Sequence, residues 1–236
     1  MNSTPRALEK QAPASGARGP GSAAALEAIR ALVRPDLEAV DLAIRAGLKS
    51  IVPLVDQVAE HIIAGGGKRL RPLLVVLAGR ACGITDAAAR PHIQAAAFIE
   101  FIHTATLLHD DVVDMSALRR GRDTANEVFG NQATVLVGDF VYSRAFQMMA
   151  AVRSQRVIEI MAEATNVIAE GEVLQLMNAR DPDTTEQRYL EVIHRKTAQL
   201  FQAGAEVAAV VCAAAPAVQQ ALARYGKHLG TAYQLI

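Results

Sequence analysis

The sequence predicts an all-α protein, and three observations support this fold class. Apolar residues recur at spacings of three and four along most of the 236 residues, as on the buried face of a helix. Ala, Leu, Glu, Gln and Arg recur throughout, whereas aromatic residues make up only 4%. The sequence contains no alternating strand pattern of useful strength. Because 51% of the residues are hydrophobic, the chain can bury a sizeable core, and we expect about nine helices packed as a bundle.

The amino-terminal residues 1–22 differ from the rest of the chain. They are rich in Pro, Ser, Gly and Ala, and they cannot bury enough apolar surface to offset the entropy lost on ordering. We therefore expect a flexible tail over residues 1–22 and a single helical domain over residues 23–236. Pro35 is expected to close or kink the first helix of that domain. A second helix is predicted over residues 36–46, and a third begins near Ser50.

A glycine turn followed by cations ends the third predicted helix. Gly65, Gly66 and Gly67 come first, and Lys68, Arg69 and Arg71 follow before Pro72 begins a helix that runs to Ala81. Backbone amides of such a turn and nearby cations bind phosphate together. An ordinary helix end followed by a solvated basic turn explains the same residues. The segment lacks the Walker A pattern, because its first glycine and the Ser or Thr after the lysine are missing.

An acidic cluster lies in an apolar stretch farther along the chain. Asp110 and Asp114 share one face at helical spacing, and Asp111 lies about 100° round the helix. Burying an unpaired carboxylate costs several kcal/mol, so a half-buried acidic trio requires a cation or a water-filled cavity. Carboxylates of this kind, together with substrate phosphate oxygens, suit Mg²⁺. The alternative is a solvated acidic helix end before a turn.

One long helix is predicted to carry this cluster. It begins at a cap formed by Thr85 and Asp86 or at Pro91, and no glycine or proline follows until Gly121. His103 lies two turns before Asp110 and shares the face of the acids, although a lone helix histidine is more often a satisfied core or surface residue. Glu100 falls near the same line. The predicted buried positions are Ile93, Ala97, Phe101 and Leu108.

The remaining elements are also predicted to be helices and turns. In chain order they are a loop over residues 119–123, a short helix from Thr124 to Phe129, helices over 132–152 and 154–178, a turn at 181–183, a helix from Thr184 or Thr185, and a last helix from Pro216. Close helix packing explains Gly138, and a hydrogen-bonded buried acid explains Asp139. Lys196 and Thr197 could contact phosphate, although such a pair usually lies on the surface.

Composition excludes several classes of protein. The 24 basic and 24 acidic residues balance, so no overall positive field would attract nucleic acid. Cys82 and Cys212 lie in apolar, Ala-rich surroundings, as reduced thiols of a cytosolic protein do. The amino terminus lacks the apolar core of a secretory signal, and the uncharged run 207–218 is too short to span a bilayer. We expect a soluble, cytoplasmic protein.

Several motifs in a fixed order carry a resemblance. The chain is similar to trans-isoprenyl diphosphate synthases of the long-chain polyprenyl type, in particular the octaprenyl-type enzymes of bacterial quinone side-chain synthesis. The similarity runs from about Ile51 to the end, through the segments GGGKRLRP, FIEFIHTATLLHDDVVD, RRG, VLVGDF, AEGEVLQL, the Lys-Thr pair and GTAYQLI. It implies a helical bundle with a central cavity.

The resemblance also implies a reaction and roles for individual residues. The reaction would join isopentenyl diphosphate to an allylic diphosphate, head to tail and trans, with Mg²⁺ as cofactor. Asp110 and Asp114 match the Mg²⁺ ligands, Asp111 supports them, and Arg119 matches a contact to the allylic diphosphate. The isopentenyl diphosphate site would comprise Lys68, Arg71, His103 and Arg120, and the allylic site would be completed by Lys196, Thr197 and Gln234.

Product length is expected to depend on the depth of a tunnel below the acids. Ala105 and Thr106 stand where short-chain members carry aromatic residues, so we expect a long product, which an Ala105→Phe change should shorten. Phe146 or Met149 could form the floor of the tunnel, although core packing explains both equally well. A homodimer is expected, with the apolar helices around residues 129–149 as candidate interface, and the product could be released at a membrane surface.

The sequence departs from the family pattern at its end. Members of the family continue past QLI into a second aspartate-rich motif, so we expect a truncated chain that is impaired or inactive because its metal site is half built. Three other hypotheses remain. A class I terpene cyclase ionises a single diphosphate and has little use for GGGKRLRP. A non-catalytic subunit of a heteromeric prenyl synthase would normally lose the acids. A purely structural helical bundle leaves the ordered motifs unexplained.

Overall fold

The computed structural model describes residues 20–84, 90–179 and 181–236, with side chains from residue 24 onward. Two compact units divide the chain, residues 1–32 and 33–236. The predicted tail lies outside the described residues except for 20–22, which belong to a helix. The predicted cap at Thr85 and Asp86 also lies outside the described residues. The expectation of one helical domain over residues 23–236 stays a prediction.

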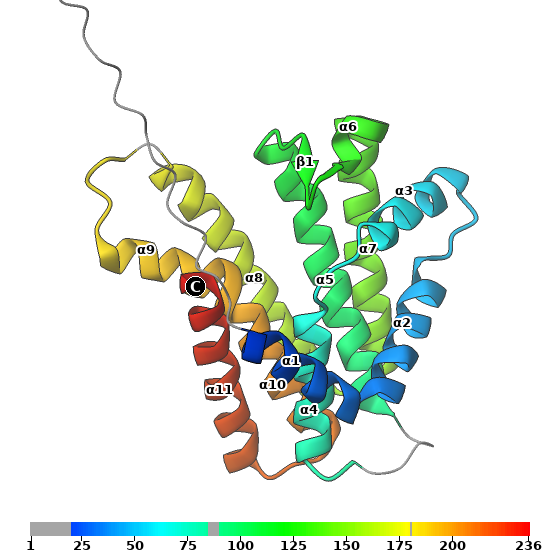
Figure 1. The fold of residues 1–236 in the computed structure, drawn as a ribbon, viewed down its shortest axis with the longest axis vertical. Coiled ribbons are helices and arrows are strands. Elements are labelled where there is room, and N and C mark those ends of the chain that lie inside the picture. Colours follow the sequence, from blue (N-terminus) through cyan, green and yellow to red (C-terminus); the bar gives the residue numbers. More distant parts are fainter. Residues whose placement is uncertain (1–19, 85–89, 180) are drawn as a thin grey trace, which may run out of the picture. The chain divides into compact units, whose positions relative to one another are not determined.

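Helices make up nearly all of the described structure, which confirms the predicted all-α class (Figure 1). Eleven α-helices are present within the described ranges, more than the nine or so that were predicted. No helix among these residues combines the length and apolar character needed to cross a membrane. The elements are α1 (Pro20–Leu32), α2 (Arg34–Leu48), α3 (Pro53–Ala64), α4 (Leu70–Ala81), α5 (Pro91–Val113), β1 (Leu118–Arg119), β2 (Arg122–Asp123), α6 (Ala125–Phe129), α7 (Asn131–Ala151), α8 (Gln155–Asn178), α9 (Glu186–Ile193), the π-helical segment η1 (His194–Ala198), α10 (Gln199–Val211) and α11 (Pro216–Leu235).

Proline lies in the first turn of several helices in this chain, and the prediction that Pro35 closes or kinks the first helix agrees with a break in the helix two residues before Pro35. Helix α1 ends at Leu32, and Pro35 lies in the first turn of α2. Proline suits this position because the first turn needs no backbone N–H and because its fixed φ is already helical. Pro53 and Pro216 occupy the same kind of position in α3 and α11.

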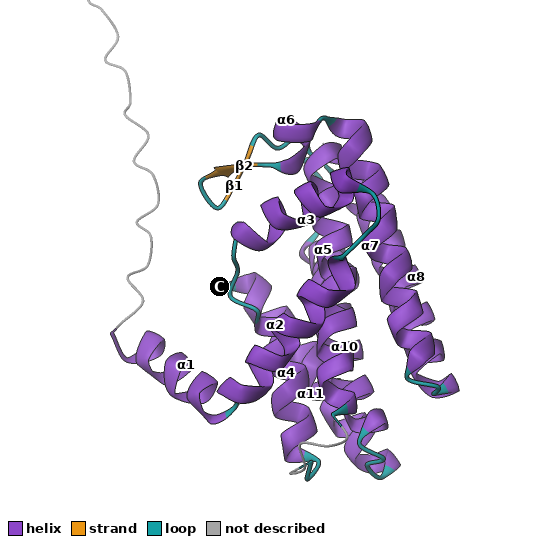
Figure 2. Cartoon of the chain, turned by 90° about the vertical axis from the view of Figure 1, so that its right-hand side faces the viewer, coloured by secondary structure: helices purple, strands orange, loops and turns teal. Residues whose placement is uncertain are grey.

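Helix α5 is the centre of the core. It is in contact with α2, α4, α7 and α10, so most of its circumference is covered (Figures 1 and 2). The four predicted core positions in this helix are all at least 96% buried, which confirms them: they are Ile93, Ala97, Phe101 and Leu108. A helix covered on nearly all sides buries any charge that it carries, and this constrains the acids near its carboxyl end.

A small β-hairpin replaces the loop predicted after α5. Strands β1 and β2 pair antiparallel, with Leu118 opposite Asp123. The two turn residues Arg120 and Gly121 have φ of 55° and 77°, and positive φ at both positions is what a type I′ turn requires. Two-residue strands are too short to give an alternating pattern, and Arg-Gly is a weaker turn signal than Asn-Gly. The sequence therefore did not reveal the hairpin.

A π-helical segment interrupts what the sequence predicts as one continuous helix. Gly171 of α8 faces this segment, because a Cβ there would lie 2.7 Å from Arg195 Cβ and 2.9 Å from Lys196 N. On another side, a Cβ on Gly230 of α11 would lie 2.7 Å from Ala198 Cα. Both helices thus approach the segment too closely for any side chain at these positions. The two glycines fix the backbone that carries Lys196 and Thr197.

The predictions for Gly138 and Asp139 in α7 have different outcomes. A Cβ on Gly138 would collide with the imidazole of His109, which confirms the prediction of close helix packing. The prediction that Asp139 is a buried acid is wrong, because 64% of its side chain is exposed. Its Oδ1 lies 3.3 Å from His109 Nε2, so a partner on α5 holds it at the surface.

We predict that Gly230→Ala lowers the free energy of unfolding by about 2 kcal/mol. The added methyl group would collide with the backbone of η1, and overpacking outweighs the gain of about 1 kcal/mol in helix propensity. Gly204→Ala in α10 is the matched control. Its Cβ would meet side-chain atoms and no backbone atom within 4 Å: Val75 Cγ2 at 3.1 Å, and Ile99 Cδ1 and Cγ1 at 3.7 Å. Urea denaturation should show the control within about 1 kcal/mol of the original chain; equal losses in both variants would contradict the packing argument.

Candidate functional site

A cavity of 350 Å³ brings together residues that are far apart in the sequence, and we call it the polar cavity. Its walls come from α4, the carboxyl-terminal part of α5, the hairpin, α8, η1, α10 and α11. Most of the predicted site residues are among the lining residues: Arg71, His103, Thr106, Leu107, Asp110, Asp114, Arg119, Arg120, Ile168, Glu172, Lys196, Thr197, Leu200, Tyr233 and Gln234.

One wall of the polar cavity is acidic. Asp110 and Asp114 come from the end of α5, and Glu172 faces them from α8. Lys196 lies between the two helices, with its Nζ 3.4 Å from Asp110 Oδ2 and 2.6 Å from Glu172 Oε2. Burial raises the pKa of Asp110 and of Glu172. Burial alone would lower the pKa of Lys196, but its hydrogen bond to Glu172 and the charge of Asp110 outweigh this effect and raise it.

The acidic wall suits a divalent cation that is shared with a substrate. Lys196 pairs with Asp110 and Glu172, whereas Asp114 is exposed beside them. Within the described ranges, no three His, Cys, Asp or Glu side chains are arranged to hold a metal by themselves. Mg²⁺ usually takes one or two protein carboxylates and completes its shell with water and phosphate oxygens. Asp110 and Asp114 would supply those carboxylates, with a bound phosphate supplying further oxygen ligands.

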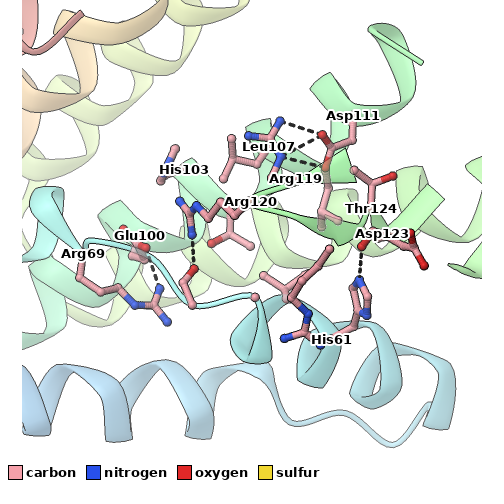
Figure 3. Close-up of a pocket in the computed structure, with 17 residues that line it drawn as sticks. His61, Arg69, Glu100, His103, Leu107, Asp111, Arg119, Arg120, Asp123 and Thr124 are labelled. Carbon is pink, nitrogen blue, oxygen red and sulfur yellow. Dashed lines mark hydrogen bonds and ion pairs between the residues drawn. The ribbon is translucent and has the colours of Figure 1, made fainter. Parts of the chain in front are cut away.

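Asp111 is oriented differently from its two neighbours. Its buried carboxylate accepts hydrogen bonds from Arg119, with Nε at 2.9 and 3.1 Å and Nη2 at 2.7 Å (Figure 3). Arg119 comes from β1 and lines the polar cavity. Asp111 itself does not line the polar cavity, and its carboxylate holds the guanidinium of Arg119. Its predicted support of the metal ligands stays a prediction.

The opposite wall is basic and partly buried. The guanidinium of Arg71 lies over the ring of Phe201, 4.6 Å from its centroid. Burial lowers the pKa of Arg71 to about 10, so the group is charged at neutral pH. Burial, followed by the charges of Arg71 and Arg120, lowers the pKa of His103 well below its ordinary value, so His103 is neutral. A bound anion would be attracted by the arginines and would also favour protonation of this histidine.

The glycine turn and the hairpin complete the basic wall. Arg120 donates to the carbonyl of Gly66 (Figure 3). Arg122 donates to the carbonyl of Ala64. A Cβ on Gly67 would lie 2.5 Å from Arg120 Nη1, so a larger residue there would displace the guanidinium of Arg120. A second cavity of 40 Å³, which we call the basic cavity, lies beside this turn. It is lined by Gly67, Lys68, Arg69, Leu70, Arg71, Glu100, His103, Arg120, Phe201 and Tyr233. The structure thus gathers the four residues predicted for isopentenyl diphosphate.

Thr197 and Gln234 meet at the edge of the polar cavity. Thr197 Oγ1 and Gln234 Oε1 are 3.1 Å apart and form a hydrogen bond between η1 and α11. The hydroxyl of Thr197 is the donor in this pair, since Oε1 can only accept. Their predicted roles in binding remain predictions, but the structure places both beside Lys196.

An apolar cavity of 500 Å³ adjoins the polar cavity. The two cavities share lining residues on α5 and α8: Thr106, Asp110, Asp114, Ile168 and Glu172. Thr106 therefore lines both cavities, and its predicted effect on product length stays a prediction. Ala105 is fully buried and lines neither cavity. Phe146 does not line the apolar cavity either, but its ring centroid lies 5.2 Å from that of Tyr142, which does. Met149 is fully buried in the core. The effects of Ala105 and Phe146 on product length stay predictions.

Some residues of the site were not assigned from the sequence. Glu172 lies in the AEGEVLQL segment, where Glu170 and Glu172 flank Gly171, and the sequence does not show which of the two acids faces the cavity. Arg69 was noted only as part of a basic run, and Glu100 only by its position on the face of the acids. Their ion pair links α4 to α5. Tyr233 lines both the polar and the basic cavities, but a lone tyrosine on a helix carries no specific signal.

Comparisons with known proteins identify the family of this chain. Residues 52–236 match the polyprenyl synthetase family. The octaprenyl diphosphate synthase of Escherichia coli (strain K12) is 55% identical over 211 residues, which cover 89% of this chain and 64% of that protein. A decaprenyl diphosphate synthase from Rhodobacter capsulatus has 47% identity and a TM-score of 0.84, covering 89% of this chain and 64% of that one. A polyprenyl synthase from Caulobacter crescentus CB15, complexed with calcium and isoprenyl diphosphate, has 47% identity and a TM-score of 0.85, covering 89% and 63%. The chain spans less than two thirds of the length of these relatives.

We predict that Asp111→Asn lowers the free energy of unfolding by about 2 kcal/mol. The change removes the charge that holds the partly exposed Arg119, so the loss should be smaller than for a fully buried pair. Asp114→Asn is the matched control, because Asp114 is exposed. Urea denaturation should place the control within about 0.5 kcal/mol of the original chain. A loss of the same size at Asp114 would contradict the specific role of the Asp111–Arg119 pair.

We also predict that His103 makes stability depend on pH. Its pKa is lower in the folded chain than its ordinary value of 6.5, so the unfolded chain binds the extra proton and stability falls as the pH drops below 6.5. His103→Asn should reduce this slope by up to about 1.4 kcal/mol per pH unit between pH 6.5 and 5.5. Denaturant unfolding at several pH values provides the measurement. An unchanged slope would mean that His103 is not held neutral.

Proposed function

The chain belongs to the polyprenyl synthetase family, and we propose that it acts as a long-chain trans-prenyltransferase. It would condense isopentenyl diphosphate with an allylic diphosphate, head to tail, to give a polyprenyl diphosphate for quinone side chains. The observation that carries this proposal is the pairing of an acidic and a basic wall around one polar cavity that adjoins an apolar cavity. Two diphosphates need separate cationic sites, and a growing prenyl chain needs an apolar one.

The two walls suit different substrates. The head of the allylic diphosphate would lie against Asp110 and Asp114 through Mg²⁺, with Arg119 and Lys196 as direct hydrogen-bond donors. Its apolar tail would enter the apolar cavity past Thr106. Isopentenyl diphosphate would lie in the basic cavity, where the predicted residues Lys68, Arg71, His103 and Arg120 gather. Divalent-metal use is consistent with the calcium and isoprenyl diphosphate bound to the Caulobacter crescentus relative.

The reaction would proceed in three steps, for which the chain supplies charge and orientation. The allylic carbon–oxygen bond breaks and diphosphate departs, the isopentenyl double bond attacks the allylic cation, and a proton is lost to restore an alkene. Mg²⁺, when bound, supplies charge neutralisation of the departing diphosphate. Arg119 and Lys196 are already held by Asp111 and Glu172, so they can stabilise the charge that develops without reorganising. The released diphosphate is the proposed proton acceptor.

The proposed function also includes an oligomeric state and a cellular location for the protein. We propose a homodimer, and its support is the exposure of Val128 in α6 and of Leu136 in α7, at 49% and 67%. Cys82 and Cys212 are free thiols, which is consistent with the proposed cytoplasmic location. Release of the apolar product at a membrane surface would avoid exposing it to water.

The proposed activity is tested by incubating the 236-residue chain with Mg²⁺, farnesyl diphosphate and labelled isopentenyl diphosphate. Chain elongation detected by chromatography would support the proposed transferase activity. Cyclic hydrocarbon would indicate a terpene cyclase instead. Binding of isopentenyl diphosphate without turnover would contradict activity of this chain, and it would fit the impairment predicted from the sequence.

We predict that Thr106→Phe shortens the product. Thr106 lines both cavities, so an aromatic ring there would narrow the path between them. The companion change Ala105→Phe, expected from the sequence to shorten the product, would act from a fully buried position and should also lower stability. Ala221→Phe on the exposed surface of α11 is the control and should leave product length unchanged. Mass spectrometry of the products measures their length. A product of the original length from Thr106→Phe would show that the growing chain does not pass Thr106.

A further inference from the structure

Glu100 is the one acidic side chain among the described residues that line the basic cavity. The same cavity is lined by Lys68, Arg69, Arg71 and Arg120. Glu100 is 7% exposed, so its carboxylate meets little water. A buried carboxylate beside a site for diphosphate repels the ligand, and this is a cost that some other contribution must offset.

The carboxylate is engaged by one of the four cations. Arg69 Nη1 donates to Glu100 Oε1 at 2.6 Å, as Figure 3 shows. The side chains are 27% and 10% exposed, so water screens this pair only weakly. A second acid, Asp41 of α2, lies 3.7 Å from Arg69 Nε and is 57% exposed. Glu100 is therefore the principal partner of Arg69.

Arg69 also has an unusual backbone conformation. Its φ of 45° and ψ of 39° lie in the left-handed region, which costs a non-glycine residue about 1 kcal/mol. It is the N-cap residue of α4, and its carbonyl accepts the first bond of the helix, from Leu73 N at 3.0 Å. Lys68 directly precedes this bend, and Arg71 lies two residues after it. The directions of both side chains therefore depend on the bend at Arg69.

Glu100 is not needed to keep its other neighbour charged. The pKa of Arg71 is about 10 after burial, and the charge of Glu100 opposes that lowering. Arg71 would remain protonated at neutral pH even with a smaller contribution from Glu100. We therefore look for the effect of Glu100 in the geometry of the basic cavity and not in the protonation of Arg71.

We infer that Glu100 is a positioning residue for isopentenyl diphosphate: through Arg69 it holds the left-handed bend that directs Lys68 and Arg71 into the basic cavity. This inference rests on the proposed function, because it assigns isopentenyl diphosphate to that cavity. It also gives Arg69 a role different from those of Lys68 and Arg71. Arg69 orders the site, while the other two would contact the ligand.

The test measures isopentenyl diphosphate binding to the 236-residue chain by isothermal titration calorimetry. Glu100→Gln keeps the shape and removes the charge. Electrostatic repulsion alone predicts tighter binding for this variant, whereas a positioning role predicts a roughly tenfold increase in Kd. Asp41→Asn is the matched control, because it removes the weaker and more exposed partner of the same guanidinium. The control should stay within about twofold of the original chain.

A double-mutant cycle shows whether Glu100 acts through Arg69. Arg69→Gln should also raise the Kd, and Glu100→Gln combined with Arg69→Gln should bind no more weakly than Arg69→Gln alone. Additive losses would overturn the inference, as would tighter binding by Glu100→Gln. If Glu100→Gln does not fold by circular dichroism, Glu100→Asp replaces it. That variant keeps the charge, but its side chain is one methylene shorter than that of glutamate. If Glu100→Asp bound isopentenyl diphosphate with the affinity of the original chain and at an unchanged Tm, the inference would also be overturned.

The results of these measurements distinguish failure of the positioning role of Glu100 from failure of the proposed function. If the original chain does not bind isopentenyl diphosphate, the proposed function fails at this site. If the original chain binds it and Glu100→Gln binds as well or better, the proposed function stands and only the positioning role fails.

Discussion

The structure depends on one constraint, which is that α5 carries carboxylates although it is covered by other helices on most sides. Each acidic residue of this helix has a cation from a different element. Glu100 pairs with Arg69 at the start of α4, Asp111 with Arg119 in β1, and Asp110 with Lys196 in η1. Because an unpaired buried carboxylate is costly, these pairs fix the positions of three separate segments around one helix. The cavity walls are the result of that arrangement.

Much of the fold could be predicted from the sequence because helices leave local signals. Apolar spacing located the core positions of α5, and glycine and proline marked most helix ends. The acids at Asp110 and Asp114 were predictable as a site because their spacing places them on one face. The basic cavity was predictable from the run after the glycine turn together with His103, since a phosphate site needs amides and cations.

Other features depend on contacts between distant segments, and the sequence could not reveal them. Nothing local shows that Asp111 faces Arg119 or that Glu172 reaches Lys196 from α8. Arg69 takes a left-handed conformation without being glycine, so no residue preference indicates it. The hairpin and η1 are each only a few residues long, too short for a periodic pattern. The contact of Asp139 with His109 likewise joins two different helices.

The π-helical segment has a consequence for how the chain tolerates length changes. One extra residue in a turn shifts the phase of every later residue in the same helix by about 100°. Helices α9 and α10, which η1 joins into one continuous rod over residues 186–211, therefore differ in burial. Helix α9 buries only Ile193, whereas α10 buries most of its residues. Deleting one codon within residues 194–198 would rotate Lys196 and Thr197 out of phase with α10. The same deletion within the turn at residues 181–183 would leave both helical phases intact, so insertions and deletions should accumulate in the turn and be excluded from the rod.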